Sequence, residues 1–384
     1  MDILIEGWRR INHSYSLVNQ WQINELIKSC NIFFKDIPFV SKDWNIKKND
    51  SGFDDDFKNL INSLKPPLNN QNFDITYRIA APYNFDTDFN SKSLFVFGTC
   101  EYKSLNKEKY INGSPALLAN EENFFIHTPS NWSKEGFLKA GFREDQILVI
   151  PHGVEINTFK LISEDEKRKI REKYKIKADD IVLTNIGAMT QNKGIESLVA
   201  AYGLLKKKNK NLKLILKDQS NLYNIEANYI FNKLHESEFN KKYKIIYDEM
   251  LKDVIIISKN LSLKELRDIY SITSCYVSPY TAEGFNMTPL EAAACGAQIA
   301  VTKGGSTDDY FDKCMGYQIE SNERKVNDDT FMNPKLDSLI EILNQIIIKN
   351  DKSKLIRSKY VHENFSWKNI TKKLKKEFEK KSTK

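Results

Sequence analysis

The sequence predicts an α/β protein made of two doubly wound halves, and three observations support this. Short apolar runs alternate with helix-like stretches along most of the chain, which is typical of parallel sheets covered by helices. The pattern forms two successive series, joined near residues 153–162. A chain of 384 residues is long enough for two domains at ~100–200 residues each, and its 41% hydrophobic residues are sufficient for two cores.

The first series contains six predicted strands. They are the apolar runs 3–5, 32–34, 75–79, 94–97, 124–127 and 147–150. An amphipathic helix is expected from about residue 16 to residue 29. The polar stretch 41–72, which contains Pro66 and Pro67, is expected to leave the sheet as irregular or short helical structure.

The second series begins after Phe159. Ser163 and Glu166 have the spacing of a capping box, which predicts the start of a helix. Five strands are predicted with helices between them, at residues 181–186, 212–216, 254–257, 275–277 and 298–301.

Composition excludes several classes of protein. The 58 basic and 51 acidic residues give a net charge of +7, which permits an anionic ligand or membrane surface but does not require nucleic acid. Five scattered cysteines without a CxxC pair disfavour a disulfide scaffold or a zinc ribbon. No apolar segment approaches the ~20 residues that span a bilayer, so we expect a soluble, cytoplasmic protein without a nucleic-acid partner. The histidines lack metal-binding spacing and Asp54–Asp56 lie in a polar stretch, so no metal is expected.

The strongest functional pattern lies at residues 278–296. A buried strand ends at Ser278, and a helix is expected to begin near Pro289, with Thr288 as its N-cap and Gly296 after its end. Unpaired amides at such a helix start, at the carboxyl end of a parallel strand, favour an anion.

Two glutamates flank this helix start. Glu283 could accept hydrogen bonds from sugar hydroxyls, and Glu291 could hold a ribose diol. Thr288 and Glu291 also have the spacing of a capping box, so a purely structural role for Glu291 is an equal alternative. The two roles are compatible.

These residues carry a resemblance to a known family. Glu283 and Glu291 form an E-x7-E arrangement in EGFNMTPLEAAACG, which resembles the donor-site signature of glycosyltransferase family 4 (glycosyl transferases group 1). Three further segments resemble the same family in the same order: residues 127–159, 181–202 and 297–311. Together they extend the resemblance over roughly residues 127–370.

The resemblance implies the GT-B fold, in which two Rossmann-like domains face a central cleft. Residues 1–155 would form the acceptor-side domain, 156–362 the nucleotide-sugar donor domain, and 363–384 a helix that crosses back to the first domain and ends in a basic tail. The implied reaction transfers a sugar from a UDP- or GDP-sugar to a glycan, glycolipid or protein acceptor. The family implies retention of anomeric configuration and no tightly bound metal or cofactor.

The resemblance also assigns donor-site roles. Lys193 would contact the diphosphate, and Glu283 would orient the sugar and stabilise its positive charge. The arginine that usually accompanies this lysine is replaced by Ala188, and Lys217 is a candidate substitute. Asn260 would approach the nucleobase. The donor-binding positions are Gly187, Lys193, Lys217, Asn260, Gly284, Phe285, Asn286, Met287, Thr288 and Glu291.

The loop after the first strand is expected to face the acceptor. Related enzymes have a glycine-rich loop there, whereas this chain retains only Gly7. Trp8 could stack on a sugar, and Arg9 or Arg10 could meet an anionic acceptor, although packing or a surface charge is an equal alternative. The candidate acceptor-side residues are Trp8, Arg9, Arg10, His13 and Glu101.

Two further segments allow weaker predictions. Residues 304–307 are expected to form a turn with free amides for phosphate or sugar, or an ordinary glycine turn. The lysine-rich segment 372–384 could give a weak peripheral contact with anionic lipid, although a solvated helix is the favoured interpretation. The alternative functions are a non-catalytic glycan- or nucleotide-sugar-binding protein and a nucleotide-sugar epimerase or hydrolase.

Overall fold

A computed structural model describes residues 1–39, 44, 52–243, 245, 247–349 and 351–382. The chain divides into two compact units. Unit 1 contains Met1–Gly153, Asn327–Thr330 and Phe365–Lys384, and unit 2 contains Val154–Val326 and Phe331–Asn364.

Unit 1 is built on a parallel sheet of six strands in the order β2-β1-β3-β5-β7-β8. These strands are β1 (Asp2–Gly7), β2 (Asn31–Asp36), β3 (Phe73–Ile79), β5 (Ser91–Phe97), β7 (Phe124–Thr128) and β8 (Ile147–Val149). All six correspond to predicted apolar runs. A small second sheet pairs β4 (Tyr83–Asn84) with β6 (Tyr110–Ile111).

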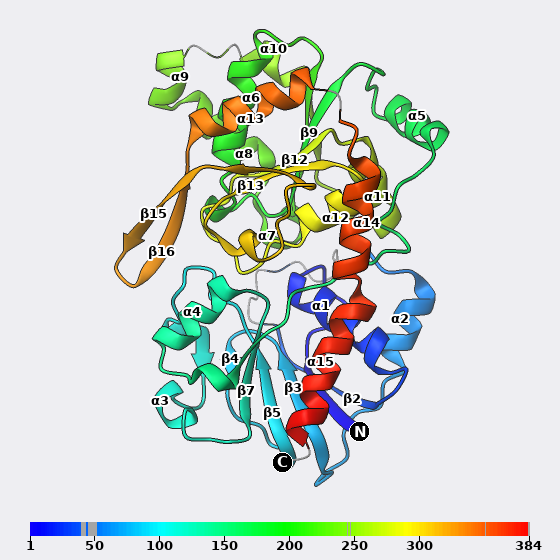
Figure 1. The fold of residues 1–384 in the computed structure, drawn as a ribbon, viewed down its shortest axis with the longest axis vertical. Coiled ribbons are helices and arrows are strands. Elements are labelled where there is room, and N and C mark those ends of the chain that lie inside the picture. Colours follow the sequence, from blue (N-terminus) through cyan, green and yellow to red (C-terminus); the bar gives the residue numbers. More distant parts are fainter. Residues whose placement is uncertain (40–43, 45–51, 244, 246, 350, 383–384) are drawn as a thin grey trace. The chain divides into compact units, whose positions relative to one another are not determined.

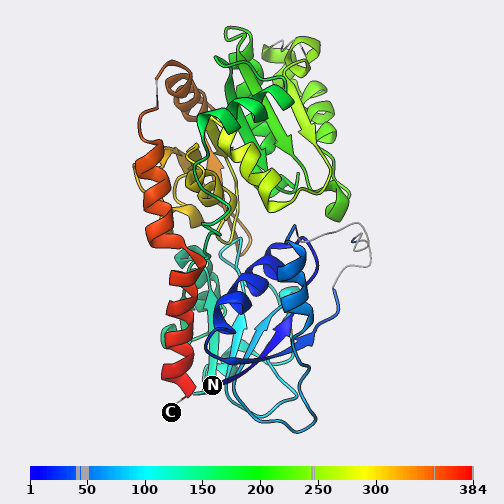
Figure 2. The same cartoon turned by 90° about the vertical axis from the view of Figure 1, so that its right-hand side faces the viewer.

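The helices of unit 1 cover this sheet. They are α1 (Ser14–Leu26), α2 (Asp55–Asn62), α3 (Pro115–Leu118), α4 (Asn131–Lys139) and α15 (Trp367–Ser382). The last of them, α15, packs against α1, β3 and β5, as Figure 1 shows from the front and Figure 2 from the side. Asp54 accepts a hydrogen bond from the amide of Phe57 and so caps α2. The predicted excursion over 41–72 therefore contains a short helix, and part of it lies outside the described residues.

Unit 2 has a second parallel sheet of six strands in the order β11-β10-β9-β12-β13-β14. The strands are β9 (Ile181–Ile186), β10 (Leu212–Lys217), β11 (Val254–Ile257), β12 (Cys275–Ser278), β13 (Gln298–Thr302) and β14 (Gly316–Ile319). The strand order reverses between β9 and β12. Loops at the carboxyl ends of two such strands diverge to opposite faces of the sheet and leave room for a ligand.

Helices cover both faces of this sheet. They are α5 (Glu164–Lys173), α6 (Ile195–Lys206), α7 (Ser220–Tyr223), α8 (Ala227–His235), α9 (Glu238–Tyr243), α10 (Tyr247–Leu251), α11 (Leu263–Ile272), α12 (Thr288–Ala294), α13 (Leu336–Ile348) and α14 (Lys354–Phe365). The helix α6 packs against α8 and α13, and α11 packs against α5 and α12. Ser163 and Glu166 form the predicted capping box of α5. Neither β14 nor the two-stranded sheet of β15 (Ser321–Val326) and β16 (Asp329–Pro334) was predicted.

No helix in the described ranges is both long enough and apolar enough to cross a membrane.

Candidate functional site

The loops after β9 and β12 meet where the strand order reverses in unit 2. The carbonyl oxygen of Asn192 accepts a hydrogen bond of 2.7 Å from the amide of Thr281, and its side-chain amide donates to the carbonyl of Ala282 at 3.0 Å. Gly194 makes this approach possible, because it has a φ of +66° and a Cβ there would lie 1.9 Å from the carbonyl oxygen of Pro279. The two loops are therefore fixed to each other.

This junction brings Lys193 and Glu283 together, although they are 90 positions apart in the chain. The ammonium of Lys193 forms an ion pair and hydrogen bond with the Oε1 atom of Glu283. The Glu283 side chain is 7% exposed and that of Lys193 27% exposed, so the pair has one buried and one accessible partner. Sequence reasoning assigned a separate role to each residue and did not predict their contact.

The loop between Glu283 and α12 has a backbone shape suited to an anion. Asn286 has a φ of +68°, and Met287 after it has right-handed helical angles. Successive left- and right-handed residues turn three consecutive N–H groups toward one point. In the described part of the chain, no acceptor is found for the amides of Asn286, Met287 and Thr288.

Side chains hold this loop in place. The side-chain amide of Asn286 donates to the hydroxyl of Ser278 at 2.8 Å, and its oxygen accepts from the hydroxyl of Thr288 at 3.3 Å. The carbonyl oxygen of Asn286 accepts a 2.8 Å hydrogen bond from the hydroxyl of Tyr310. Asn286 was predicted to bind the donor; its side chain shapes the loop, and its backbone amide is one of the three without an acceptor in the described chain.

The predicted capping of α12 is wrong. Thr288 is the first helical residue and Met287 occupies the N-cap position without a side-chain cap. The Thr288 hydroxyl instead accepts a hydrogen bond from the hydroxyl of Tyr276 at 2.7 Å, and Glu291 accepts one from the hydroxyl of Tyr270 at 2.9 Å. The capping-box alternative for Glu291 is thereby removed. Burial raises the pKa of Glu291 to about 7, and the hydrogen bond from Tyr270 partly opposes that rise.

Three other predicted donor-site residues follow neighbouring strands. Gly187 comes directly after β9, its amide donates to the carbonyl of Lys217 at 3.0 Å, and a Cβ on it would meet nothing within 4 Å. Lys217 ends β10 and is buried, and its ammonium donates to the carbonyl of Asp218 at 2.6 Å. Burial lowers the pKa of Lys217 to about 8. Asn260, after β11, accepts a 3.4 Å hydrogen bond from the side chain of Asn221.

At the turn of residues 304–307, the hydrogen bonds of two amides agree with the alternative of an ordinary glycine turn. The amide of Gly304 donates to the carboxylate of Asp308 at 2.9 Å, and the amide of Thr307 donates to the hydroxyl of Tyr280 at 3.1 Å. These two amides therefore serve the protein itself and are not free for a phosphate or a sugar.

In unit 1, several acceptor-side candidates have structural roles. Trp8 is only 1% exposed and its indole N–H donates to the carbonyl of Pro38 at 3.3 Å, which agrees with the packing alternative and not with stacking on a sugar. Arg9 binds the carboxylate of Asp36 through two hydrogen bonds, of 2.9 and 2.6 Å, and is therefore occupied within the protein.

The remaining candidates of unit 1 differ in exposure. His13 caps α1, because its Nδ1 atom accepts a hydrogen bond from the amide of Tyr15 at 3.1 Å. Glu101 is half-buried, and its carbonyl oxygen accepts from the indole of Trp132 at 2.8 Å. The Arg10 side chain is 56% exposed and 3.5 Å from Asp36, which leaves it the most accessible cation of this loop.

Sequence reasoning missed the tyrosines that fix the loops of unit 2. Tyr270, Tyr276, Tyr280 and Tyr310 are buried, and each places its hydroxyl against a loop or helix of the site. Four tyrosines among residues 270–310 were a usable signal, because a buried phenol requires a hydrogen-bond partner.

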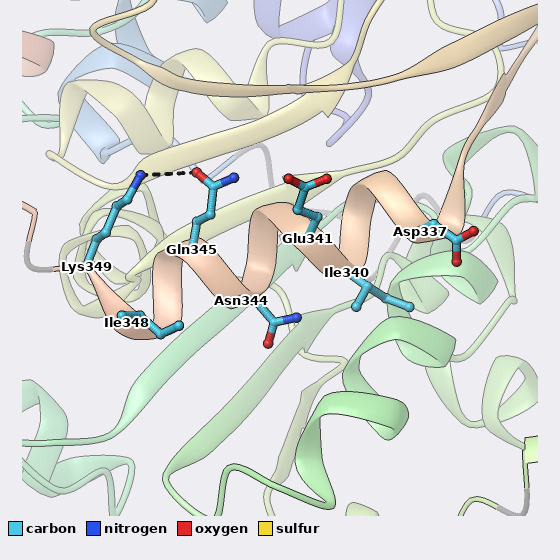
Figure 3. A pocket seen from close by; sticks show the side chains of 7 residues that line it. All are labelled: Asp337, Ile340, Glu341, Asn344, Gln345, Ile348 and Lys349. Atoms are coloured by element: carbon cyan, nitrogen blue, oxygen red, sulfur yellow. Dashed lines mark hydrogen bonds between the residues drawn. The ribbon is translucent and has the colours of Figure 1, made fainter.

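A hollow elsewhere in unit 2 does not coincide with this site. It has a volume of about 470 Å³. Figure 3 shows the side chains that line it, along α13. Its lining residues are Asp337, Ile340, Glu341, Asn344, Gln345, Ile348 and Lys349. All of them belong to or directly follow one helix, and none is a predicted site residue. Among the described residues, no group of three or more His, Cys, Asp or Glu side chains is arranged to hold a metal ion.

Comparison with known proteins shows which family this region is similar to. The family model "Glycosyl transferases group 1" matches residues 166–328. The lipopolysaccharide 1,2-N-acetylglucosaminetransferase of Salmonella typhimurium is 27% identical over 270 residues, which are 67% of this chain and 65% of that protein. An uncharacterised glycosyltransferase of Methanocaldococcus jannaschii is 28% identical over 295 residues, which are 75% of this chain and 66% of that protein. The aligned parts thus span just under two thirds of each relative.

Solved structures show the same fold. The Anabaena protein HepE, crystallised with UDP-glucose, superposes with a TM-score of 0.67 over 99% of this chain and 100% of its own, at 15% identity. The fold of the present chain is GT-B, as the sequence resemblance implied. The resemblance to glycosyl transferases group 1 is confirmed, and the narrower assignment to family 4 stays a prediction.

Proposed function

We propose, because the family model of the glycosyl transferases group 1 matches residues 166–328, that this protein transfers a sugar from a UDP- or GDP-sugar to a hydroxyl acceptor. One structural observation carries the proposal. The Lys193–Glu283 ion pair lies in the same junction as the loop whose amides at residues 286–288 have no acceptor in the described chain. A cation and converging N–H groups favour a diphosphate, and the adjacent carboxylate suits the hydroxyl groups of a sugar.

The proposed chemistry is electrostatic. As the bond between sugar and diphosphate breaks, negative charge grows on the leaving group. The ammonium of Lys193 and the amides of Asn286, Met287 and Thr288 stabilise that charge because they are held in position beforehand. Glu283 orients the sugar and faces the positive charge that develops at its anomeric carbon. Transfer proceeds with retention and without a metal ion.

Binding of the donor changes the partner of Lys193. In the structure its ammonium is bound to Glu283. A diphosphate brings more negative charge than one carboxylate, so the accessible lysine turns toward it and leaves Glu283 to the sugar. Glu291 holds the ribose diol in its ionised form.

The roles of the two units are part of the proposal. Unit 2 contains the donor site, and unit 1 binds a glycan, glycolipid or protein acceptor, with Arg10 as its most accessible cation. The complex of HepE with UDP-glucose makes UDP-glucose the first donor to test. We also propose that the protein acts in the cytoplasm.

Thermal-shift measurements test the donor site. UDP or GDP should raise the melting temperature more than the corresponding monophosphate or nucleoside, because a ligand that binds only the folded state stabilises it. Equal effects of monophosphate and diphosphate would contradict a diphosphate-centred site.

Turnover measurements separate transfer from its alternatives. Donor consumption that requires an acceptor and survives EDTA is expected. Consumption without an acceptor would identify a hydrolase or epimerase, and binding without consumption would identify a sugar-binding protein. Loss of turnover in EDTA with recovery in Mg²⁺ or Mn²⁺ would contradict the metal-free mechanism.

A further inference from the structure

The peptide between Asn286 and Met287 is held from one side by a buried phenol. Tyr310 comes from the segment after β13 and is 2% exposed. Its hydroxyl donates a 2.8 Å hydrogen bond to the carbonyl oxygen of Asn286, and its ring packs on that of Phe285 with 5.1 Å between ring centres. A residue of one loop thus fixes the backbone of the neighbouring loop.

The geometry of a peptide makes this bond directional. The Asn286–Met287 peptide is trans, since the only cis bond among the described residues is Ala81–Pro82. The carbonyl and the N–H of a trans peptide point in opposite directions because the unit is planar. A carbonyl that points at the buried Tyr310 hydroxyl therefore directs the amide of Met287 away from the interior.

The amide of Met287 is the middle one of three that converge. The left-handed angle of Asn286 and the right-handed angles of Met287 place the amides of residues 286–288 around one point. Rotation of the Asn286–Met287 peptide would replace the central N–H by a carbonyl oxygen, which repels an anion. The hydrogen bond from Tyr310 opposes that rotation.

We propose that Tyr310 is a positioning residue, whose hydroxyl holds the Asn286–Met287 peptide with its N–H directed at the diphosphate of the nucleotide-sugar. The inference rests on the proposed function, since it needs a diphosphate at this loop. Tyr310 does not touch the donor and acts through the backbone. Stabilisation of the departing diphosphate therefore depends on Tyr310 in addition to Lys193 and Glu283.

The test compares two buried tyrosines of unit 2. Tyr310→Phe removes the hydroxyl and keeps the ring against Phe285. Tyr202→Phe is the matched control, because the Tyr202 hydroxyl also donates to backbone carbonyls, of Asp253 at 3.3 Å and Leu212 at 3.5 Å, at the amino end of β10. Affinity for UDP, UMP and uridine, melting temperature and turnover of UDP-glucose are measured for each, and GDP, GMP, guanosine and GDP-mannose serve in their place if guanine is the base.

Tyr310→Phe should weaken diphosphate binding roughly tenfold, which is the effect of losing one well-placed hydrogen bond. Nucleoside affinity should change by less than about twofold, and kcat should fall. Tyr202→Phe should leave diphosphate affinity, nucleoside affinity and kcat unchanged. Equal losses for diphosphate and nucleoside, or a melting temperature far below that of Tyr202→Phe, would show a structural role and overturn the inference.

A spectroscopic measurement follows the amide itself. The chain has six methionines, so selective ¹⁵N-methionine labelling gives few amide signals. The signal that disappears in Met287→Leu is that of the Met287 amide. UDP should move the Met287 amide signal downfield in the wild type and much less in Tyr310→Phe. An equal movement in both would overturn the inference. If the wild type binds no nucleoside diphosphate, the proposed function fails as well; if Lys193→Ala weakens UDP binding and Tyr310→Phe does not, only this inference fails.

Discussion

At Glu283, charge and hydrogen bonding can be separated by one substitution. Glu283→Gln keeps the size and an acceptor for the Lys193 ammonium but removes the negative charge. We expect kcat to fall by on the order of 10²-fold or more, as after the loss of one preorganised electrostatic group. The melting temperature should change little, because the Lys193 ammonium is accessible and water can solvate it once its ionic partner is neutral. Steady-state kinetics with thermal melting checks this, and near-normal transfer would end the catalytic assignment of Glu283.

Lys193→Ala should differ from Glu283→Gln in its effect on stability. It leaves the carboxylate of Glu283, whose side chain is 7% exposed, without its cation. A buried charge that loses its partner is destabilising, so this variant should melt below Glu283→Gln as well as bind diphosphate less well.

Glu291 predicts a pH dependence of donor binding. Its pKa is raised to about 7 by burial, so the carboxylate gains a proton as the pH falls below 7. The protonated form is the weaker acceptor for ribose hydroxyls, and affinity should therefore drop by roughly fivefold or more between pH 8 and pH 6. The phosphate of the ligand titrates in the same range, so the measurement is the difference between wild type and Glu291→Gln in calorimetric titrations. Parallel pH profiles would exclude the ribose role.

The residues of the donor motif could be found in the sequence, but their surroundings could not. Spacing identified Glu283, Lys193 and Glu291 as candidates, whereas the partners of Glu291 and Lys193 come from elements far away in the chain. The capping box between Thr288 and Glu291 was a valid local pattern. Tertiary hydrogen bonds from Tyr270 and Tyr276 replaced it.

At the scale of elements, apolar runs predicted every strand of the two six-stranded sheets except β14, because buried parallel strands are continuously apolar. The missed elements lack that signal. β15, with the sequence SNERKV, is mostly exposed, and no core-facing alternation marks it. The loop after β1 was expected to face the acceptor, yet Trp8, His13 and Trp44 pack together there, with ring centres 5.1–5.4 Å apart. Packing between residues that are far apart in the chain produces no periodic pattern in the sequence.

The junction of the β9 and β12 loops gives a prediction about Gly194. Gly194→Ala places a methyl group where the carbonyl of Pro279 lies, at a φ of +66°. We expect the two loops to separate, with lower stability and at least tenfold weaker diphosphate binding. Gly141→Ala is the control, because Gly141 has a φ of +107° in unit 1 and its added Cβ would approach nothing closer than 3.9 Å. It should lower the melting temperature without affecting UDP binding, and the same pattern for Gly194→Ala would argue against the junction as the site.

The whole molecule consists of two units joined in an order that sequence patterns alone did not show. The chain completes unit 2 and then returns residues Phe365–Lys384 to unit 1. In the sequence this return came only from the family resemblance. Its physical reason is visible in α15, where Ile370, Leu374 and Phe378 recur every four residues and are fully buried.

This division predicts that stability and nucleotide binding can be altered separately. Phe378→Ala empties a site in unit 1 against Tyr77 and Phe95, whose ring centres lie 5.5 and 4.7 Å away. Phe231→Ala does the same in the core of unit 2. Each should cost about 3–5 kcal/mol of stability in its own unit.

Calorimetry with and without UDP distinguishes the two variants. Because the proposed donor site belongs wholly to unit 2, Phe378→Ala should lower a melting transition that UDP does not shift, and leave the UDP-dependent transition in place. Phe231→Ala should lower the transition that responds to UDP. If Phe378→Ala lowered the UDP-dependent transition as much as Phe231→Ala does, the units would unfold as one, and the stability of the donor site would depend on the returning helix.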